Sequence, residues 1–191
     1  YARNPELVIN FYNERRKQLL EVRPNDGHLG LAELEADFNV TVVTQNIDNL
    51  HERAGSRRII HLHGELTKVC SSRDPYNPHY IKELKPDEYE VKFGDKAGDG
   101  TQLRPFIVWF GEPVPEIETA VNYVEKADIF VIIGTSMNVY PAAGLLNYVP
   151  REAEVYLIDP KPVDVHSMRR IHVIQKGASE GVRELRSLLQ P

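Results

Sequence analysis

The sequence has very little cysteine, no excess of basic residues and no long apolar run, and each shortage excludes a class of protein. Its 191 residues include one cysteine, Cys70, so an internal disulfide and a four-cysteine zinc site are both excluded. We therefore expect a cytoplasmic protein in a reducing compartment. The net charge of −5 argues against a nucleic-acid partner. No apolar stretch approaches the ~20 residues that a membrane-spanning helix needs, so we expect no membrane partner.

Two amphipathic helices are predicted at the start of the chain. Apolar residues recur at helical spacing over residues 5–21, with Asn4 as the cap and Pro5 in the first turn. A similar pattern follows Pro24 and ends near Asn39.

Short apolar runs rich in β-branched residues follow, each with the pattern of a strand buried on both faces of a parallel sheet. The predicted strands are residues 40–44, 59–62, 106–110, 129–133, 155–158 and 171–174. Helical stretches at 116–126, 142–148 and 179–189 separate several of them. This alternation predicts an α/β fold, a doubly wound, mostly parallel, Rossmann-like sheet with helices on both faces.

Residues 67–102 break the alternation, because they are rich in Asp, Gly, Pro, Tyr and Lys and hold no long periodic segment. We interpret them as a small inserted module without zinc, and residues 1–66 and 103–191 as the Rossmann-like domain. The module's core is predicted from six inward-packing side chains: Tyr76, Tyr80, Ile81, Leu84, Tyr89 and Phe93.

Polar residues follow four of the predicted strands at their carboxyl ends, where open α/β sheets bind ligands. These segments are residues 44–48, 61–64, 134–136 and 159–160. Together they offer amides, hydroxyls, carboxylates and imidazoles, which suit a polar nucleotide and a proton transfer. Helix capping is the alternative for any one segment, but four of them favour a ligand site.

These segments resemble, in order and spacing, the motifs of the sirtuin family. The matching positions are 44–48, 63–64, 104–105, 109–112 and 134–136, with Val139 and 141–143, and they cover nearly the whole chain. The resemblance implies an NAD-dependent protein-lysine deacylase. Such an enzyme transfers the acyl group from lysine to the ribose of NAD and produces nicotinamide and O-acyl-ADP-ribose.

The resemblance also implies roles for individual residues. His63 is similar to the catalytic base, which takes a proton from the nicotinamide ribose, and imidazoles suit this task because they titrate near neutrality. Gln45, Asn46 and Asp48 resemble the residues that bind the nicotinamide and its ribose. The other implied NAD contacts are Gly134, Thr135, Ser136, Asp159, Gly177 and Ala178; many relatives have asparagine where Asp159 stands.

The partner implied by the resemblance is an acylated lysine of a protein, bound as an added strand between residues 108–112 and 137–140. The implied substrate-binding residues are Val108, Phe110, Gly111, Glu112 and Val139. Tyr12 and Arg15 share a helix face at i and i+3, and their segment resembles the one by which one sirtuin class binds acidic acyl groups. We therefore expect desuccinylase and demalonylase activity besides deacetylase activity. The alternative is a surface arginine beside a half-buried tyrosine.

Two family features are missing from the sequence: the glycine-rich start of the nucleotide site and most of the zinc cysteines. We therefore expect weakened NAD binding by these 191 residues, and no zinc. Two other functions remain open. One is a protein that binds NAD or ADP-ribose without catalysis. The other is a metal-dependent hydrolase built on His61 and His63, which is less favoured because no further cluster with metal-ligand spacing follows.

Overall fold

The computed structural model describes residues 1–135, 142–163 and 169–190, and the chain divides into two compact units. The first unit comprises Tyr1–Arg23, Thr44–Asn49 and His61–Val114, and the second comprises the remaining segments. The chain passes between the units inside β1 (Val42–Thr44) and β2 (Ile59–His61), which form a two-stranded sheet. None of the described helices combines the length and apolarity needed to cross a membrane.

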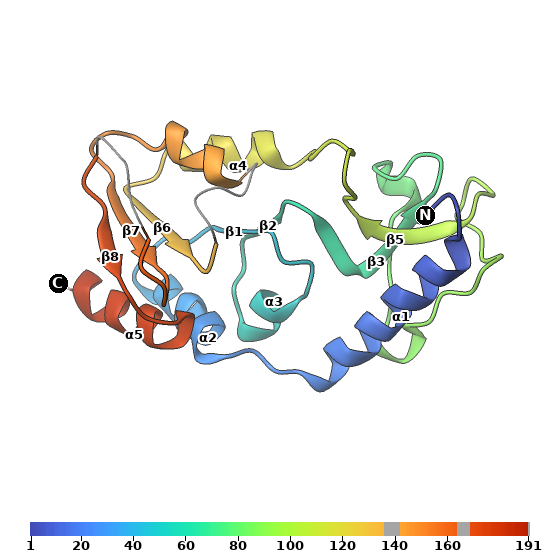
Figure 1. Cartoon of the computed structure of the whole chain (residues 1–191), viewed down its shortest axis with the longest axis horizontal. Coiled ribbons are helices and arrows are strands. Elements are labelled where there is room, and N and C mark those ends of the chain that lie inside the picture. The colour runs from blue at the N-terminus through green and yellow to red at the C-terminus, as the bar shows by residue number, and fades with distance from the viewer. Residues whose placement is uncertain (136–141, 164–168, 191) are drawn as a thin grey trace. The chain divides into compact units, whose positions relative to one another are not determined.

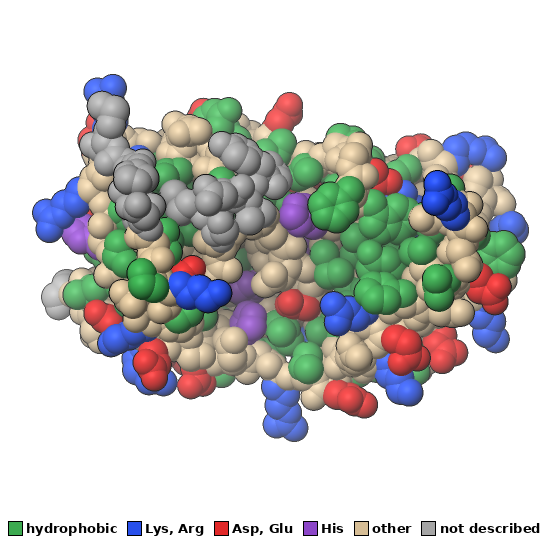
Figure 2. All heavy atoms as spheres, viewed as in Figure 1, with side chains coloured by type: hydrophobic (Ala, Val, Ile, Leu, Met, Phe, Trp, Pro, Cys, Tyr) green, Lys and Arg blue, Asp and Glu red, His purple; other side chains and the backbone are tan. Residues whose placement is uncertain are grey.

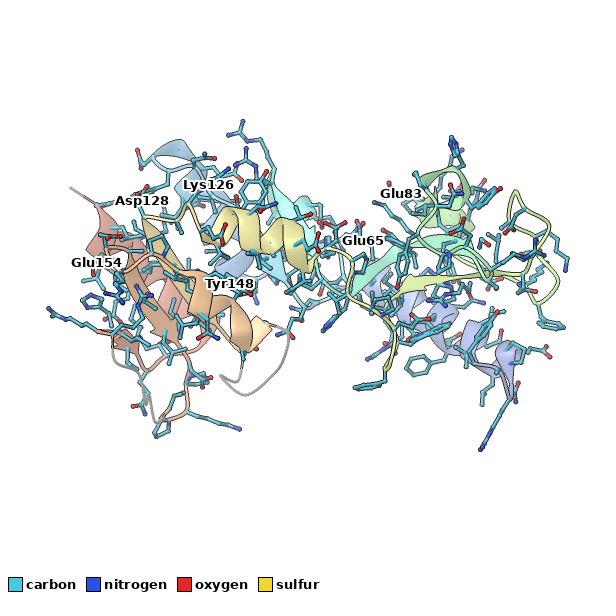
Figure 3. The ribbon with its side chains drawn as sticks, turned by 90° about the horizontal axis from the view of Figure 1, so that it is seen from above. Glu65, Glu83, Lys126, Asp128, Tyr148 and Glu154 are labelled. Atoms are coloured by element: carbon cyan, nitrogen blue, oxygen red, sulfur yellow. The ribbon has the colours of Figure 1, made fainter. Side chains whose placement is uncertain are left out.

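The first unit contains an antiparallel sheet and a long helix. Helix α1 (Pro5–Glu21) begins where the Asn4 side chain accepts a hydrogen bond from the Leu7 amide at 3.1 Å, as expected from the sequence. The sheet has the order β4-β3-β5, made of β3 (Gly64–Ser71), β4 (Lys82–Glu83) and β5 (Leu103–Ile107). Glu65 and Glu83 mark β3 and β4 in Figure 3. Ile9 of α1 packs with Val69 and Val91 in the core of this unit.

Two buried polar side chains of α1, Asn13 and Arg16, bind the helix to the rest of the first unit. Asn13 exchanges two hydrogen bonds with the backbone of Val91, at 2.8 and 2.9 Å. Arg16 donates from Nε to the Leu66 carbonyl at 2.8 Å and from Nη1 to the Tyr89 carbonyl at 3.2 Å. Burial lowers the pKa of Arg16 to about 10, because the charged form loses solvation by water. These bonds fix the rotation of α1 about its axis, and with it the side chains that α1 presents elsewhere.

Residues 67–102 are more regular than the sequence predicts. They contain most of β3, all of β4, and two short 3₁₀ helices, η2 (Pro78–Tyr80) and η3 (Pro86–Glu88). The inward packing predicted for Phe93 is wrong, because its side chain is 59% exposed. Phe93 lies in a tight turn closed by hydrogen bonds between Lys92 and Asp95, and a residue at such a turn tip points to solvent. The other five predicted side chains are half-buried.

A hydrogen-bonded cluster around the buried Ser71 joins the end of β3 to the segment that precedes β5. The Ser71 hydroxyl donates to Asp99 Oδ2 at 2.6 Å and accepts from the amides of Arg73 and Asp74. Thr101 binds the other Asp99 oxygen through its hydroxyl and its amide, at 2.7 and 3.1 Å. The hydrogen bonds from Ser71 and Thr101 lower the pKa of Asp99 to about 2. The carboxylate is therefore ionised over the whole neutral range.

We expect the thiol of Cys70 to be unreactive in the folded protein. Cys70 is fully buried on β3, 3.8 Å from the Pro105 carbonyl, and burial raises its pKa to about 11. The thiolate is the nucleophile, so both effects suppress its reaction with Ellman's reagent at pH 8. The native protein should release almost no thionitrobenzoate, and the protein in guanidinium should release one equivalent. A Ser187→Cys variant, whose new thiol replaces an exposed side chain, should release one equivalent when native. Rapid labelling of the unaltered native protein would contradict the burial.

The second unit contains a three-stranded parallel sheet between helices. Strands β6 (Ile129–Ile133), β7 (Glu154–Ile158) and β8 (His172–Ile174) pair in that order. Helices α2 (Asp26–Glu33) and α5 (Ala178–Leu189) lie on one side of the sheet and α4 (Ile117–Val124) on the other (Figure 1). The remaining elements of this unit are η1 (Leu34–Ala36), α3 (Leu50–Ala54) and η4 (Ala142–Tyr148).

The core of the second unit joins the sheet to α5. Ile158 and Ile174 cluster with Val182 and Leu185 of α5. Gly181 permits this close approach, because a Cβ at that position would lie 2.2 Å from the Ile158 side chain.

The amino and carboxyl ends of this parallel sheet lie at opposite rims. Asp128 and Glu154, labelled in Figure 3, stand at the amino ends of β6 and β7, where the Glu154 amide donates to the Asp128 carbonyl at 3.0 Å. Residues that follow the strands therefore gather at the other rim.

The predicted strands of the second unit are confirmed, since β6 matches residue for residue and β7 and β8 differ by one residue at their starts. The strand predicted at 106–110 is wrong in position and in pairing. β5 spans Leu103–Ile107 and runs antiparallel to β3. The chain turns after Ile107, because the Glu112 carboxylate accepts a hydrogen bond from the Trp109 amide at 3.0 Å and so closes a turn.

Candidate functional site

The loop after β1 and the turn after β2 lie side by side in the first unit. The Leu62 amide donates to the Thr44 carbonyl at 2.9 Å, and the Leu66 amide donates to the Ile47 carbonyl at 2.7 Å. Within the loop, the hydroxyl of buried Thr44 accepts from the Asn46 amide at 3.0 Å. The predicted nicotinamide residues Gln45, Asn46 and Asp48 thus stand on a segment fixed against the turn that carries His63, and the Asn46 side chain is exposed.

His61 and His63 have different surroundings because β2 ends between them. His61 is the last residue of β2, and its Nδ1 lies 3.1 Å from the Asn46 carbonyl, so this nitrogen donates a hydrogen bond to the loop. His63 follows in the turn between β2 and β3, where its carbonyl accepts from the Val108 amide at 2.9 Å. Among the described residues no hydrogen bond engages the imidazole of His63. His61 therefore positions the loop, while the hydrogen bond described for His63 is made by its backbone.

Gly64 permits the change of direction immediately after His63. Its φ is +87°, and it opposes Ile107 at the start of the β3–β5 pairing. A Cβ at Gly64 would lie 2.1 Å from the Phe106 carbonyl oxygen, so no other residue fits without a shift of the backbone. The position of His63 relative to β5 thus depends on a glycine.

The predicted acyl-binding pair occupies exposed and half-exposed positions on α1. The Arg15 guanidinium lies over the ring of Phe11, 5.6 Å from its centroid, and both side chains are exposed. Among the described residues Arg15 makes no ion pair, which leaves its donors available to an anion. The Tyr12 hydroxyl accepts a hydrogen bond from Trp109 Nε1 at 3.0 Å. Figure 2 shows that hydrophobic side chains gather on the surface of the first unit, over α1 and β5.

The predicted peptide-binding segment 108–112 is a turn stabilised by its own side chains. Arg104 donates to both carboxylate oxygens of Glu112, at 2.8 and 3.0 Å, and this contact lowers the pKa of Glu112. Both backbone polar groups of Trp109 bind Glu112, so they are not available to a peptide. Phe110 is fully exposed and Gly111 has a φ of +84°. Two further predicted contacts, Ser136 and Val139, lie outside the described residues.

The other predicted NAD contacts stand at the carboxyl rim of the parallel sheet in the second unit. Gly134 follows β6, Asp159 follows β7, and Gly177 and Ala178 begin α5 after β8. The amide of Gly134 donates to the Ile158 carbonyl at 3.1 Å, and the amide of Asp159 to the Ile174 carbonyl at 3.2 Å, so these residues are neighbours in sheet order. Thr135 comes directly after Gly134 and is half-buried.

The described residues leave room at two glycines of this rim. Among the described residues, a Cβ at Gly134 or Gly177 would meet no atom within 4 Å, and no side chain caps the amides of the first turn of α5. An uncapped helix N-terminus beside an open glycine suits a phosphate or a ribose. One oxygen of Asp159 accepts from the Lys161 amide at 2.8 Å. Its other oxygen binds no described residue and fits a ribose hydroxyl.

The sequence indicated a structural role for His61 but not the bonds that hold the site in place. Thr44 and His61 fix the loop, and Arg104 with Glu112 fixes the turn. One signal was present, because Arg104 and Glu112 have opposite charges eight residues apart around a short apolar segment. Their pairing was not predictable from the spacing alone, because residues eight apart in a continuous strand would be too far apart to touch.

The parallel sheet with glycine and aspartate at its carboxyl rim defines a Rossmann-like nucleotide-binding fold. The family model described as "SIR2: Sir2 family" matches residues 1–141. The chain belongs to the Sir2 family, that of the sirtuins. A protein of Bacteroides thetaiotaomicron named "NAD-dependent protein deacylase" is 83% identical over 191 residues, which are 100% of this chain and 82% of the relative. A Helicobacter pylori protein of the same name is 47% identical over 185 residues, 97% of this chain and 78% of the relative.

Solved structures confirm the predicted α/β, Rossmann-like fold. The crystal structure of a Sir2 homologue in complex with NAD has a TM-score of 0.82 at 34% identity, covering 99% of this chain and 75% of that chain. A structure described as Sir2 with a p53 peptide and NAD+ has a TM-score of 0.78 at 27% identity, covering 98% of this chain and 79% of that chain.

Proposed function

We propose that this chain, an NAD-dependent protein deacylase of the Sir2 family, removes succinyl and malonyl groups from lysine as well as acetyl groups. The observation that carries the acidic-acyl part is the presentation of Tyr12 and Arg15 on α1. Their helix is held by buried Asn13 and Arg16, and the Arg15 guanidinium is exposed and makes no ion pair among the described residues. A guanidinium binds a carboxylate through paired, charge-assisted hydrogen bonds, and a phenol adds a third.

We assign separate catalytic roles to His63 and to the loop that follows β1. NAD, when bound, supplies nicotinamide as the leaving group and the ribose carbon that receives the acyl oxygen. We assign to His63 the removal of a proton from a ribose hydroxyl, because its imidazole has no other partner among the described residues. Gln45, Asn46 and Asp48 are assigned to the nicotinamide and its ribose. Backbone bonds and the Thr44 hydroxyl hold their loop in place, which supports a role in orienting a ligand.

Contacts to the rest of the nucleotide are assigned to Gly134, Thr135, Ser136, Asp159, Gly177 and Ala178. The open space at Gly134 and the uncapped amides of α5 support this assignment. Val108, Phe110, Gly111, Glu112 and Val139 are assigned to the acyl-lysine substrate. The full exposure of Phe110 supports an apolar contact with the lysine chain. The single thiol supports a reducing, cytoplasmic location as part of the same proposal.

Replacing Arg15 with methionine tests the acidic-acyl assignment. Arg15→Met should lower kcat/KM for a succinylated peptide by roughly 10- to 100-fold, the value of one charged hydrogen-bonding pair, and should leave the acetylated peptide within about twofold. The assay measures nicotinamide release by the full-length protein. Lys17→Met, which removes another exposed cation of α1, should change neither substrate by more than about twofold.

Three results would count against the proposal. Equal losses on both peptides would mean that Arg15 does not read the acyl group. The same selective loss in Lys17→Met would point to the general charge of α1 instead. A protein that binds NAD but releases no nicotinamide from any peptide would be a binder without catalysis.

A further inference from the structure

The hydrogen bond between Trp109 and Tyr12 has only one possible direction. The indole N–H is a donor and has no acceptor lone pair, whereas a phenol can both donate and accept. The 3.0 Å contact between Trp109 Nε1 and Tyr12 Oη is therefore a bond in which the phenol oxygen accepts. The hydrogen of the Tyr12 hydroxyl remains available to a second partner. A phenol that accepts one hydrogen bond also becomes a better donor, because the two bonds polarise each other.

The indole that makes this bond is held by two groups that stack on its ring and by a bond to its backbone. The Arg104 guanidinium lies 3.9 Å from the centroid of the Trp109 ring, and the ring of Tyr1 stacks on it at 5.1 Å with an interplanar angle of 27°. Arg104 is itself buried and bound to both oxygens of Glu112, whose carboxylate also accepts from the Trp109 amide. The direction of the indole N–H is thus set by a network that does not include Tyr12.

We propose that Trp109 is a positioning residue for acidic acyl groups, which makes the Tyr12 hydroxyl a dedicated donor to the acyl carboxylate. This inference rests on the proposed function, because it assumes that Tyr12 and Arg15 bind that carboxylate. Without the indole, the phenol can rotate and donate to water or accept from it. With the indole, one lone pair of the phenol is occupied and its hydrogen points elsewhere, so less orientation is lost when a carboxylate binds. An acetyl group has no carboxylate and gains nothing from this arrangement.

Replacing Trp109 with phenylalanine removes the N–H and keeps a ring in its place. Trp109→Phe should lower the ratio of kcat/KM for succinylated over acetylated peptide by roughly 3- to 10-fold, the value of one neutral hydrogen bond. The loss should appear mainly in KM for the succinylated peptide. Tyr12→Phe should lower the ratio by at least as much. The double variant should match Tyr12→Phe alone, because the indole acts only through the phenol.

The results separate this inference from the function on which it rests. If the unaltered full-length protein does not cleave succinylated peptide, both fail. If it does, but the two single effects multiply in the double variant, the role of Trp109 fails and the acyl preference stands. A ratio unchanged in Trp109→Phe would also overturn the inference.

A measurement that leaves Trp109 intact covers the case in which Trp109→Phe does not fold. The chain has one tryptophan, so its indole N–H gives one resonance in a proton–nitrogen correlation spectrum. Tyr12→Phe should move this resonance upfield and speed its exchange with water, since its acceptor is lost. A resonance unchanged by Tyr12→Phe would show that the bond is absent in solution, and would overturn the inference.

Discussion

Replacing His63 with alanine should reduce nicotinamide release from an acetylated peptide by roughly 100- to 10,000-fold, the range of a lost general base. The structure predicts that this loss will be chemical and not structural. The described contact of His63 is made by its backbone carbonyl, which accepts from the Val108 amide at 2.9 Å, and alanine retains that carbonyl. The melting temperature should therefore change by no more than a few degrees, and the effect should appear in kcat more than in KM for NAD.

A histidine outside the proposed site serves as the matched control. His79 is exposed on η2 of the same unit, so His79→Ala should retain the activity of the unaltered protein within about twofold. Full activity of His63→Ala would remove His63 from the proton transfer. If His63→Ala melts far below the unaltered protein, its loss of activity would instead be due to impaired folding.

Replacing Gly64 with alanine should destabilise the protein by on the order of 4 kcal/mol, because backbone strain and overpacking add at this position. The methyl group would lie 2.1 Å from the Phe106 carbonyl oxygen and 2.9 Å from the Ile107 Cα. These atoms belong to β5, so relief requires that β3 and β5 separate where they first pair. Urea unfolding followed by circular dichroism should show a transition at much lower denaturant concentration, or none.

A Gly94→Ala variant distinguishes the cost of backbone strain from the cost of the steric clash at Gly64. Its φ of +105° is also left-handed, but a Cβ there would meet no atom of the described part of the chain within 4 Å. Gly94→Ala should therefore cost only about 1–2 kcal/mol, the backbone term alone. Equal destabilisation by the two alanines would mean that the β3–β5 pairing is looser than the structure describes.

The fold of the second unit was predictable because local pattern and final environment agree there. Residues 129–133 and 155–158 are continuous apolar, β-branched runs, and they form the parallel strands β6 and β7 that such runs favour. In the first unit, β3 was not predicted, because its buried residues do not alternate regularly with polar ones. Its eight residues pair antiparallel with β4 and β5, and that pairing depends on partners far away in the sequence.

The positions of the candidate site residues at the ends of strands were predictable, but the bonds that hold them were not. His63, Asn46 and Gly134 follow strands, as the motif positions indicated. The contacts that hold them join residues far apart in sequence, such as the 15-residue separation between His61 and Asn46. The strand predicted at 106–110 fails for a related reason, since the turn after Ile107 depends on a side-chain bond from Glu112. The spacing of residues in the sequence indicates which of them share a face of a helix or strand. Hydrogen bonds such as that between Glu112 and Trp109 depend instead on the path of the folded backbone.

The Ser71 cluster joins two residues that lie 28 positions apart in the sequence, Ser71 and Asp99, through hydroxyl and carboxylate oxygens. Unlike a thiolate, these groups are not oxidised by peroxide, and the bonds between them need no ion that a chelator removes. This closure should hold unchanged when a cell meets oxidative stress or metal starvation. The end of β3 and the segment that precedes β5 should therefore stay joined under both conditions.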